Sequence, residues 1–164
     1  MMLMNHSSGF HGTSLSNAFL FDDNDSRVVD NFLDNLSMQD LKANPGKFSV
    51  YSNDEFTMLE ILVERISGMT FTEFLHEHIF YPLGFENTKI PQDYFDRNRI
   101  ALTFSSMHYV PMPTPIVNAI GTGGIFSTAE EMVIFADVLM GNRTDILSAE
   151  SVDAMLYEEY RRGI

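Results

Sequence analysis

The sequence predicts a single, mostly α-helical domain over residues 1–164, with at most one or two short strands. Three observations favour this fold class. Apolar residues recur at helical spacing in successive segments that begin at capping residues and end at Gly or Pro. Only residues 99–104 alternate briefly like a strand. A length of 164 residues fits one domain, and a 45% apolar composition is enough for a packed core.

The first helix is expected over residues 26–36, because five apolar residues fall on one helical face there. They are Val28, Val29, Phe32, Leu33 and Leu36. The sequence SMQD at 37–40 matches a capping box and predicts a further short turn of helix. NPG at 44–46 then ends that turn, while PMPTP at 111–115 predicts an extended loop.

The strongest helical signal covers residues 53–67, NDEFTMLEILVERIS. Asn53 is predicted to cap its start, and Gly68 to close it in the left-handed conformation. Its apolar stripe predicts a largely buried helix. The stripe consists of Phe56, Leu59, Val63 and Ile66, and Met58, Ile61 and Leu62 widen it.

Three further helices follow from capping signals. TFTE at 70–73 is a capping box for a helix to about residue 80, which YPLG ends. The segment 127–141 combines a capping box, an apolar stripe and a Gly stop, and Ser148 caps a last helix over 148–160. The inward residues are predicted to be Phe71, Phe74, Leu75 and Ile79 in the first helix, and Ala129, Met132, Val133, Ala136, Leu139 and Met140 in the second.

Composition excludes several classes of protein. The formal net charge of −13 disfavours binding to nucleic acid or anionic lipid. The absence of cysteine excludes disulfides, thiolate metal sites and a cysteine nucleophile. Apolar runs are too short for a membrane span, and the N-terminus lacks the pattern of a signal peptide.

Two local patterns suggest metal binding but do not support it. The histidines of HEH at 76–78 would point to nearly opposite sides of a helix, so a zinc site is not expected. DDNDS at 22–26 lacks the mid-loop Gly and the twelfth-position Glu of a calcium loop. The sequence therefore predicts no metal site.

The triplet Tyr51-Ser52-Asn53 is, by itself, no more than a helix start preceded by a half-buried aromatic. It occurs, however, with three other stretches in a particular order. These are LMNHSSGFHG at 3–12, SGMTFTEFLHEHIFYPLGFENT at 67–88 and GTGGIFSTAEEM at 121–132.

Together, the four stretches strongly resemble the serine β-lactamase and penicillin-binding-protein superfamily, in particular its class C and esterase-like branch. PGKFSVYSN, PLGFENT and GGIFSTAEEM correspond to motifs of that branch, and the resemblance runs from about residue 3 to residue 156. It implies that this chain is the all-helical subdomain that is inserted within an α/β domain, with the active site between the two.

The resemblance also implies roles for residues. Tyr51 would carry protons between a nucleophilic serine and the leaving group, and Asn53 would hold the substrate's acyl chain. His6 and the glycines Gly123 and Gly124 match structural positions without chemistry of their own. No cofactor is implied, and the substrate of the complete protein would be a small molecule or a peptidoglycan-like peptide.

Two motifs of the family are missing from this chain. Its lysines, Lys42, Lys47 and Lys89, have no serine three residues before them, so Ser-x-x-Lys does not occur. Neither Lys-Thr-Gly nor His-x-Gly follows Asn53. A phenol is a poor base at neutral pH unless cations stabilise its phenolate, and the missing motifs would supply those cations. We therefore expect this chain alone to be inactive.

The expected protein is thus a piece of a serine hydrolase, either a truncated gene product or an excised subdomain. The abrupt apolar start and the ending YRRGI both favour truncation. Surface that normally meets the missing α/β domain would be exposed, so self-association is expected.

The parent would hydrolyse a β-lactam, a D-Ala-D-Ala peptide or a carboxylic ester, and the sequence leaves these three open. A non-catalytic binding protein on the same scaffold and an unrelated helical domain are the alternatives. The family acts largely outside the cytoplasm, but this chain carries no export signal, so its location also stays open.

Overall fold

The computed structural model describes residues 1–12, 14, 19–20, 27–105, 109–114 and 116–156, and helices make up about 45% of them. The coarse prediction of a mainly helical chain with few strands is confirmed. The helical elements in chain order are α1 (Val28–Ser37), α2 (Asn53–Ser67), α3 (Phe71–Leu75), the π-helical turn η1 (His76–Phe80), α4 (Tyr81–Leu83), the 3-10 turns η2 (Arg97–Arg99) and η3 (Ile120–Thr122), α5 (Ala129–Leu139) and α6 (Ala149–Leu156).

The described strands are short and form two separate antiparallel pairs. β1 (Phe19–Leu20) pairs with β4 (Ile116–Val117), and β2 (Thr103–Phe104) pairs with β3 (Pro111–Met112). Four described strands exceed the one or two that were predicted, and β3 lies where an extended loop was expected. Each strand is only two residues long, so it leaves no alternation of apolar and polar residues to detect.

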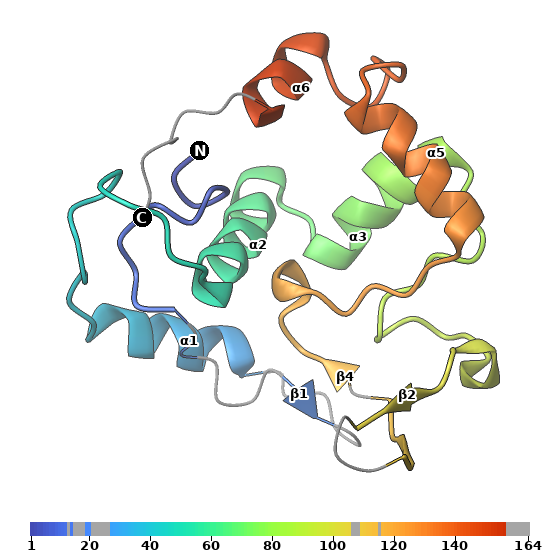
Figure 1. The fold of residues 1–164 in the computed structure, drawn as a ribbon, viewed down its shortest axis with the longest axis horizontal. Coiled ribbons are helices and arrows are strands. Elements are labelled where there is room, and N and C mark those ends of the chain that lie inside the picture. The colour runs from blue at the N-terminus through green and yellow to red at the C-terminus, as the bar shows by residue number, and fades with distance from the viewer. Residues whose placement is uncertain (13, 15–18, 21–26, 106–108, 115, 157–164) are drawn as a thin grey trace.

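The central helix, α2, has the predicted bounds, and the chain winds around it (Figure 1). Gly68 closes it with φ of 73°, as predicted. The predicted cap at Asn53 is wrong, because Ser52 is the capping residue and Asn53 is the first residue of the helix. The Asn53 side-chain oxygen instead accepts a hydrogen bond from the Tyr51 hydroxyl.

The buried face of α2 is not the predicted apolar stripe. Ile66, at the end of that stripe, is 84% exposed, and Leu62 is also exposed. The buried residues are mainly polar: Asp54, Glu55, Thr57, Glu60 and Ile61. Buried carboxylates are stable only when they are hydrogen-bonded, so the partners of these acids define what α2 packs against.

The helical segment after α2 begins and ends as predicted. Thr70 and Glu73 form a capping box, and Gly84 closes α4 with φ of 70°. Apolar side chains of this segment, of the turn after it and of α5 form the main core. The core consists of Phe80, Leu83, Phe85, Ile90, Ile120 and Val138, with Phe71, Leu75, Ile79, Phe135, Ile146 and Leu147 packed against it.

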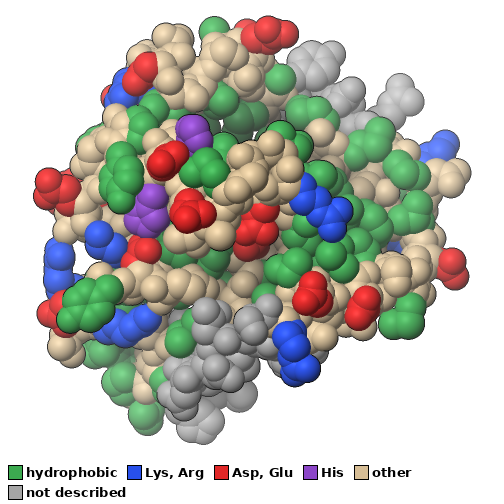
Figure 2. All heavy atoms as spheres, turned by 180° about the vertical axis from the view of Figure 1, so that it is seen from behind, with side chains coloured by type: hydrophobic (Ala, Val, Ile, Leu, Met, Phe, Trp, Pro, Cys, Tyr) green, Lys and Arg blue, Asp and Glu red, His purple; other side chains and the backbone are tan. Residues whose placement is uncertain are grey.

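The predicted inward face of α5 is wrong. Val133 and Met140 belong to that stripe and are exposed, whereas Val138 is buried in the core. The helix is capped by Thr128, one residue after the start of the predicted helix, and the Thr128 side chain accepts the Glu131 N–H. Figure 2 shows apolar side chains exposed on the face opposite that of Figure 1, with basic side chains among them.

The outer helices follow their capping signals in part. α1 buries Val28 and Phe32, as the apolar face predicts, and Ser148 accepts the Ser151 N–H at the start of α6. The helical turn predicted at 37–40 is wrong, because Ser37 ends α1 and its hydroxyl bonds back to the Asp34 carbonyl. No helix among the described residues is long and apolar enough to cross a membrane.

Candidate functional site

Tyr51 and Asn53 lie side by side where an extended segment turns into α2. The extended backbone at Ser52, with φ of −150° and ψ of 120°, places the two flanking side chains on the same side of the chain. The Tyr51 hydroxyl donates to Asn53 Oδ1 at 2.8 Å. Tyr51 is 69% exposed, so its hydroxyl is accessible to a ligand or to another segment.

An open hollow of about 340 Å³ lies beside this pair. One wall comes from the start of α2 and the Phe71 ring, and the other comes from η3 and the glycines after it. The described lining residues are His6, Tyr51, Asn53, Phe56, Phe71, Ile120, Gly121, Thr122, Gly123 and Ile125. Neither lysine nor arginine is among them, so the described walls place no fixed cation beside the phenol.

His6 supports Tyr51 from the N-terminal segment. The centroids of the His6 and Tyr51 rings are 4.8 Å apart. The ring of Phe56, a residue of α2, lies 5.2 Å from the His6 ring on the same measure. His6 Nδ1 is 2.9 Å from Glu55 Oε2, while the Ser8 hydroxyl donates to Glu55 Oε1. Glu55 is only 1% exposed, so the N-terminal segment is attached to α2 through a buried carboxylate.

Glu60 holds the opposite wall of the hollow. Its Oε2 accepts the Gly121 N–H at 2.8 Å. Burial raises the pKa of Glu60 to about 7, with a smaller contribution from the nearby Glu64 carboxylate, although the bond from Gly121 opposes the shift. A Cβ at Gly121 would lie 2.4 Å from the carbonyl oxygen of Phe56, so only glycine allows this close approach.

Glu131 joins two further parts of the chain, the turn after α4 and the start of α5. Its carboxylate accepts the Glu86 and Asn87 N–H groups at 2.9 and 2.8 Å, and the Thr88 hydroxyl at 2.5 Å. Burial alone would raise the pKa of Glu131, but the bonds from Thr88, Asn87 and Glu86 outweigh it and lower that pKa to about 2.

Three buried glutamates therefore connect the four sequence stretches that occur in a particular order. Glu55 joins residues 3–12 to the Tyr51–Asn53 segment, and Glu60 joins α2 to the glycine-rich segment at 121–124. Glu131 joins that last stretch to PLGFENT. The sequence reasoning missed these roles, although one signal was available: a carboxylate inside an apolar helical run, such as Glu60 in MLEILV, needs a buried partner.

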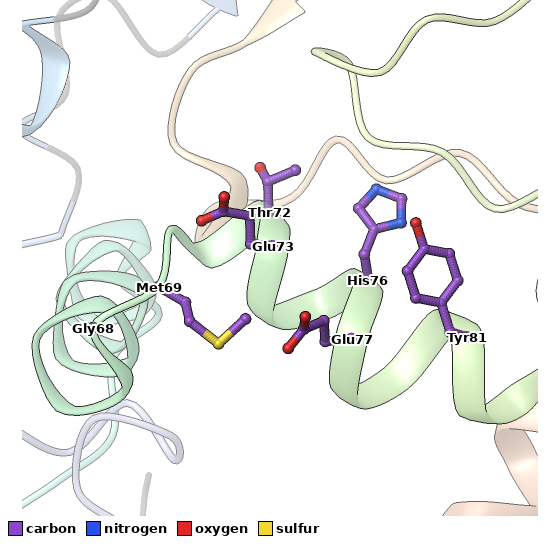
Figure 3. A pocket seen from close by; sticks show the side chains of 7 residues that line it. All are labelled: Gly68, Met69, Thr72, Glu73, His76, Glu77 and Tyr81. Carbon is purple, nitrogen blue, oxygen red and sulfur yellow. The ribbon is translucent and has the colours of Figure 1, made fainter.

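A second surface hollow, at the π-helical turn, contains the HEH histidine His76 (Figure 3). His76 Nε2 is 3.1 Å from Asp93 Oδ1, and Glu73 is occupied in the capping box with Thr70. The His78 ring packs on Phe74, with 4.4 Å between centroids. No group of three His, Cys, Asp or Glu side chains in the described part of the chain could share a metal ion. DDNDS at 22–26 lies outside the described residues.

Comparison with known proteins places these features in a family. A family model described as Beta-lactamase matches residues 1–163. The putative penicillin-binding protein PbpX of Bacillus subtilis is 22% identical over 156 residues, which are 93% of this chain and 37% of that protein. The D-alanyl-D-alanine-carboxypeptidase/endopeptidase AmpH of Escherichia coli is 32% identical over 98 residues, which are 60% of this chain and 25% of that protein.

Solved structures agree on the fold. The D-amino acid amidase of Ochrobactrum anthropi SV3, complexed with L-phenylalanine amide, matches with a TM-score of 0.73 at 20% identity. That match covers 93% of this chain and 45% of the amidase chain. This chain thus spans less than half the length of each of these proteins.

Proposed function

The chain belongs to the beta-lactamase family, and from this premise we propose that Tyr51 and Asn53 form one side of the acyl-transfer site of a serine hydrolase. The observation that supports the proposal is the 2.8 Å hydrogen bond between their side chains at the mouth of a hollow. A proton-bearing phenol and an amide in contact are suited to acyl transfer, in which a proton moves while the acyl group is held.

In the proposed mechanism, Tyr51 carries the proton from the attacking serine to the leaving group. Asn53 Oδ1 accepts the hydrogen bond from the Tyr51 hydroxyl. The Nδ2 group of the same side chain is the donor that would bind a substrate carbonyl. The His6 ring packs on Tyr51 and is bonded to Glu55, and Glu60 fixes the facing wall through Gly121. Positioning of this kind matters because small displacements of catalytic groups cost large factors in rate.

The nucleophile of the proposed site lies outside these 164 residues. No lysine in the chain follows a serine by three positions, so the pair that activates the serine in this family is absent. We propose that the chain is the helical subdomain of the complete enzyme and that an α/β domain packs against it. Exposed apolar side chains on α2 and α5, such as Ile66 and Val133, support a missing partner surface.

The proposed substrate of the complete protein is a β-lactam, a peptide ending in D-Ala-D-Ala or a carboxylic ester. AmpH is named as a D-alanyl-D-alanine carboxypeptidase, and PbpX as a putative penicillin-binding protein. The first name describes the cleavage of a peptide, and the second describes the binding of penicillin.

Intact-mass spectrometry tests the proposal on the chain itself. The purified chain is incubated with benzylpenicillin and with 4-nitrophenyl acetate, and circular dichroism confirms that it is folded. We expect no acyl adduct, because the serine–lysine pair is absent. An adduct of acyl-enzyme mass on the folded chain would contradict the proposed division of the site.

The complete protein provides the positive test. Tyr51→Phe removes the hydroxyl and is expected to lower kcat about 10²- to 10⁴-fold, the usual contribution of proton transfer by a positioned side chain. Tyr94→Phe is the matched control, because Tyr94 is fully exposed and lies outside the hollow. Equal activity of the two variants would exclude the proton-carrying role. A complete protein that binds penicillin without forming an acyl adduct, and that hydrolyses none of the three substrate classes, would favour the non-catalytic binding protein instead.

A further inference from the structure

Another pocket, of about 570 Å³, shares no lining residue with the Tyr51–Asn53 hollow. It lies between the turn at residues 87–89, the η2 segment, the start of β2 and the residues before α5. Its lining residues are Asn87, Lys89, Phe95, Asp96, Arg99, Ile100, Ala101, Thr103, Phe126, Ser127 and Thr128. The volume is within the usual range of small-molecule sites.

The apolar wall of this pocket is held firmly in place. Lys89 and Phe126 exchange two backbone hydrogen bonds of 2.8 Å each, which join the turn after α4 to the segment before α5. The Phe95 and Phe126 rings lie 5.8 Å apart. The Arg97 guanidinium lies 5.1 Å from the Phe95 ring centroid and donates to the Pro91 carbonyl at 2.6 Å. Two phenyl rings of fixed position thus offer a flat apolar contact to a ligand.

The polar side of the pocket is basic. Lys89 and Arg99 both line it, and neither forms an ion pair within the described residues. Arg99 donates to Asn87 Oδ1 at 2.7 Å, which fixes one end of its guanidinium. The lining carboxylate, Asp96, accepts the Asn98 N–H and side-chain amide at 3.0 and 2.9 Å. The described lining thus carries two cations, Lys89 and Arg99, and one carboxylate, Asp96.

We infer that this pocket binds a small amphipathic anion, a carboxylate attached to an apolar ring. The ring would lie against Phe95 and Phe126, and the carboxylate would be bound by Lys89 and Arg99. A few charged groups beside an apolar wall fix the orientation of such a ligand. The guanidinium of Arg99 can bind a carboxylate with two parallel N–H donors. This site is independent of the proposed hydrolase activity.

The test is a titration of the ¹⁵N-labelled chain with naphthalene-2-carboxylate, followed by amide chemical shifts. Naphthalene-2-carboxamide is the neutral control ligand with the same ring. We expect the carboxylate to bind more tightly than the carboxamide, with shifts at residues 87–89, 99–103 and 126–128. We expect this preference to weaken as the salt concentration rises.

Lys89→Gln is the decisive variant, and Lys47→Gln removes the same charge from an exposed position outside the pocket. Lys89→Gln should weaken carboxylate binding about two- to fivefold, the range for a partly screened charge contact, while Lys47→Gln leaves it unchanged. Equal affinity for the two ligands, or equal binding by the two variants, would overturn the inference. Shifts confined to residues 51–53 and 120–123 would place the anion in the Tyr51–Asn53 hollow and would also overturn it.

Discussion

Replacing Glu131 by glutamine tests whether one ionised carboxylate holds the start of α5 to the turn after α4. In the unchanged chain its two oxygens accept bonds from the Glu86 and Asn87 backbone and from the Thr88 hydroxyl. Glutamine keeps the shape and one acceptor oxygen but removes the charge, so the bonds become neutral and weaker.

The pKa of Glu131 gives the magnitude. Burial would raise it, but the hydrogen bonds lower it from 4.5 to about 2, which corresponds to roughly 3 kcal/mol at about 1.4 kcal/mol per pH unit. A carboxylate with a lowered folded-state pKa contributes its full stability above 4.5 and loses it as the pH falls through 2. We expect Glu131→Gln to lower the free energy of unfolding by about 3 kcal/mol at pH 7 but by only about 1 kcal/mol at pH 3.

Glu60→Gln is the control with the opposite sign. Burial raises the folded-state pKa of Glu60 to about 7, so the folded state favours its protonated form. The carboxylate therefore costs stability increasingly as the pH rises from 4.5 to 7. Glutamine mimics the neutral form and still accepts the Gly121 N–H, so this variant should be more stable than the unchanged chain at pH 8 and similar to it at pH 4.

Urea unfolding followed by far-UV circular dichroism between pH 3 and pH 8 measures both differences. The difference in free energy of unfolding between the unchanged chain and Glu131→Gln should shrink as the pH falls. The corresponding difference for Glu60→Gln should grow as the pH rises. If Glu131→Gln destabilised the chain equally at pH 3 and pH 7, the negative charge of Glu131 would not be the source of the stabilisation.

The remaining predictions concern two glycines, one helix cap and the exposed apolar surface. Gly121→Ala should lower the free energy of unfolding by about 2 kcal/mol or more, since its Cβ would lie 2.4 Å from the Phe56 carbonyl oxygen. Gly68→Ala should lower the free energy of unfolding by only about 1 kcal/mol, because the φ of 73° disfavours alanine but no atom lies within 4 Å of the added Cβ. Equal destabilisation of the two variants in thermal unfolding would contradict this reasoning. Thr70→Ala removes the capping box and should lower the free energy of unfolding by about 1 kcal/mol in the same assay. Unchanged stability would refute the role of the cap. The unchanged chain should self-associate in sedimentation experiments and Val133→Lys should reduce this; a clean monomer at high concentration would refute it.

Local signals predicted the parts of the fold that local chemistry determines. The bounds of α2, its left-handed end at Gly68 and the Thr70–Glu73 box all follow from residues within a few positions of each other. The cap predicted at Asn53 is wrong by one position, because the helix already begins at this residue and its side-chain oxygen accepts the Tyr51 hydroxyl.

The faces of the helices could not be predicted in the same way. Periodicity shows which residues share a side of a helix, but not which side meets the rest of the molecule. The α2 stripe is only half-buried and ends at the exposed Ile66, and the α5 stripe that contains Val133 is exposed, whereas the buried sides carry Glu60 and Glu131. These carboxylates are buried because distant N–H groups satisfy them, and a distant partner leaves no trace in a local pattern.

The candidate site was predictable from the order of four short motifs, and only in part. That order singled out Tyr51 and Asn53, which the structure places in hydrogen-bond contact beside a hollow. Their catalytic and binding roles remain predictions. The support from Glu55 was missed because its partners, His6 and Ser8, lie 49 and 47 positions away in the sequence.

The carboxylate links around the hollow also have a kinetic consequence. They join residues that are 47 to 49 positions apart at Glu55, 61 apart at Glu60 and 43 apart at Glu131. Closing loops of this length costs chain entropy before any link can form, and contacts of high sequence separation slow folding. During refolding, the helical signal of α2 should therefore return before the hollow acquires its walls, so a ligand that needs the hollow would bind only after the slowest phase.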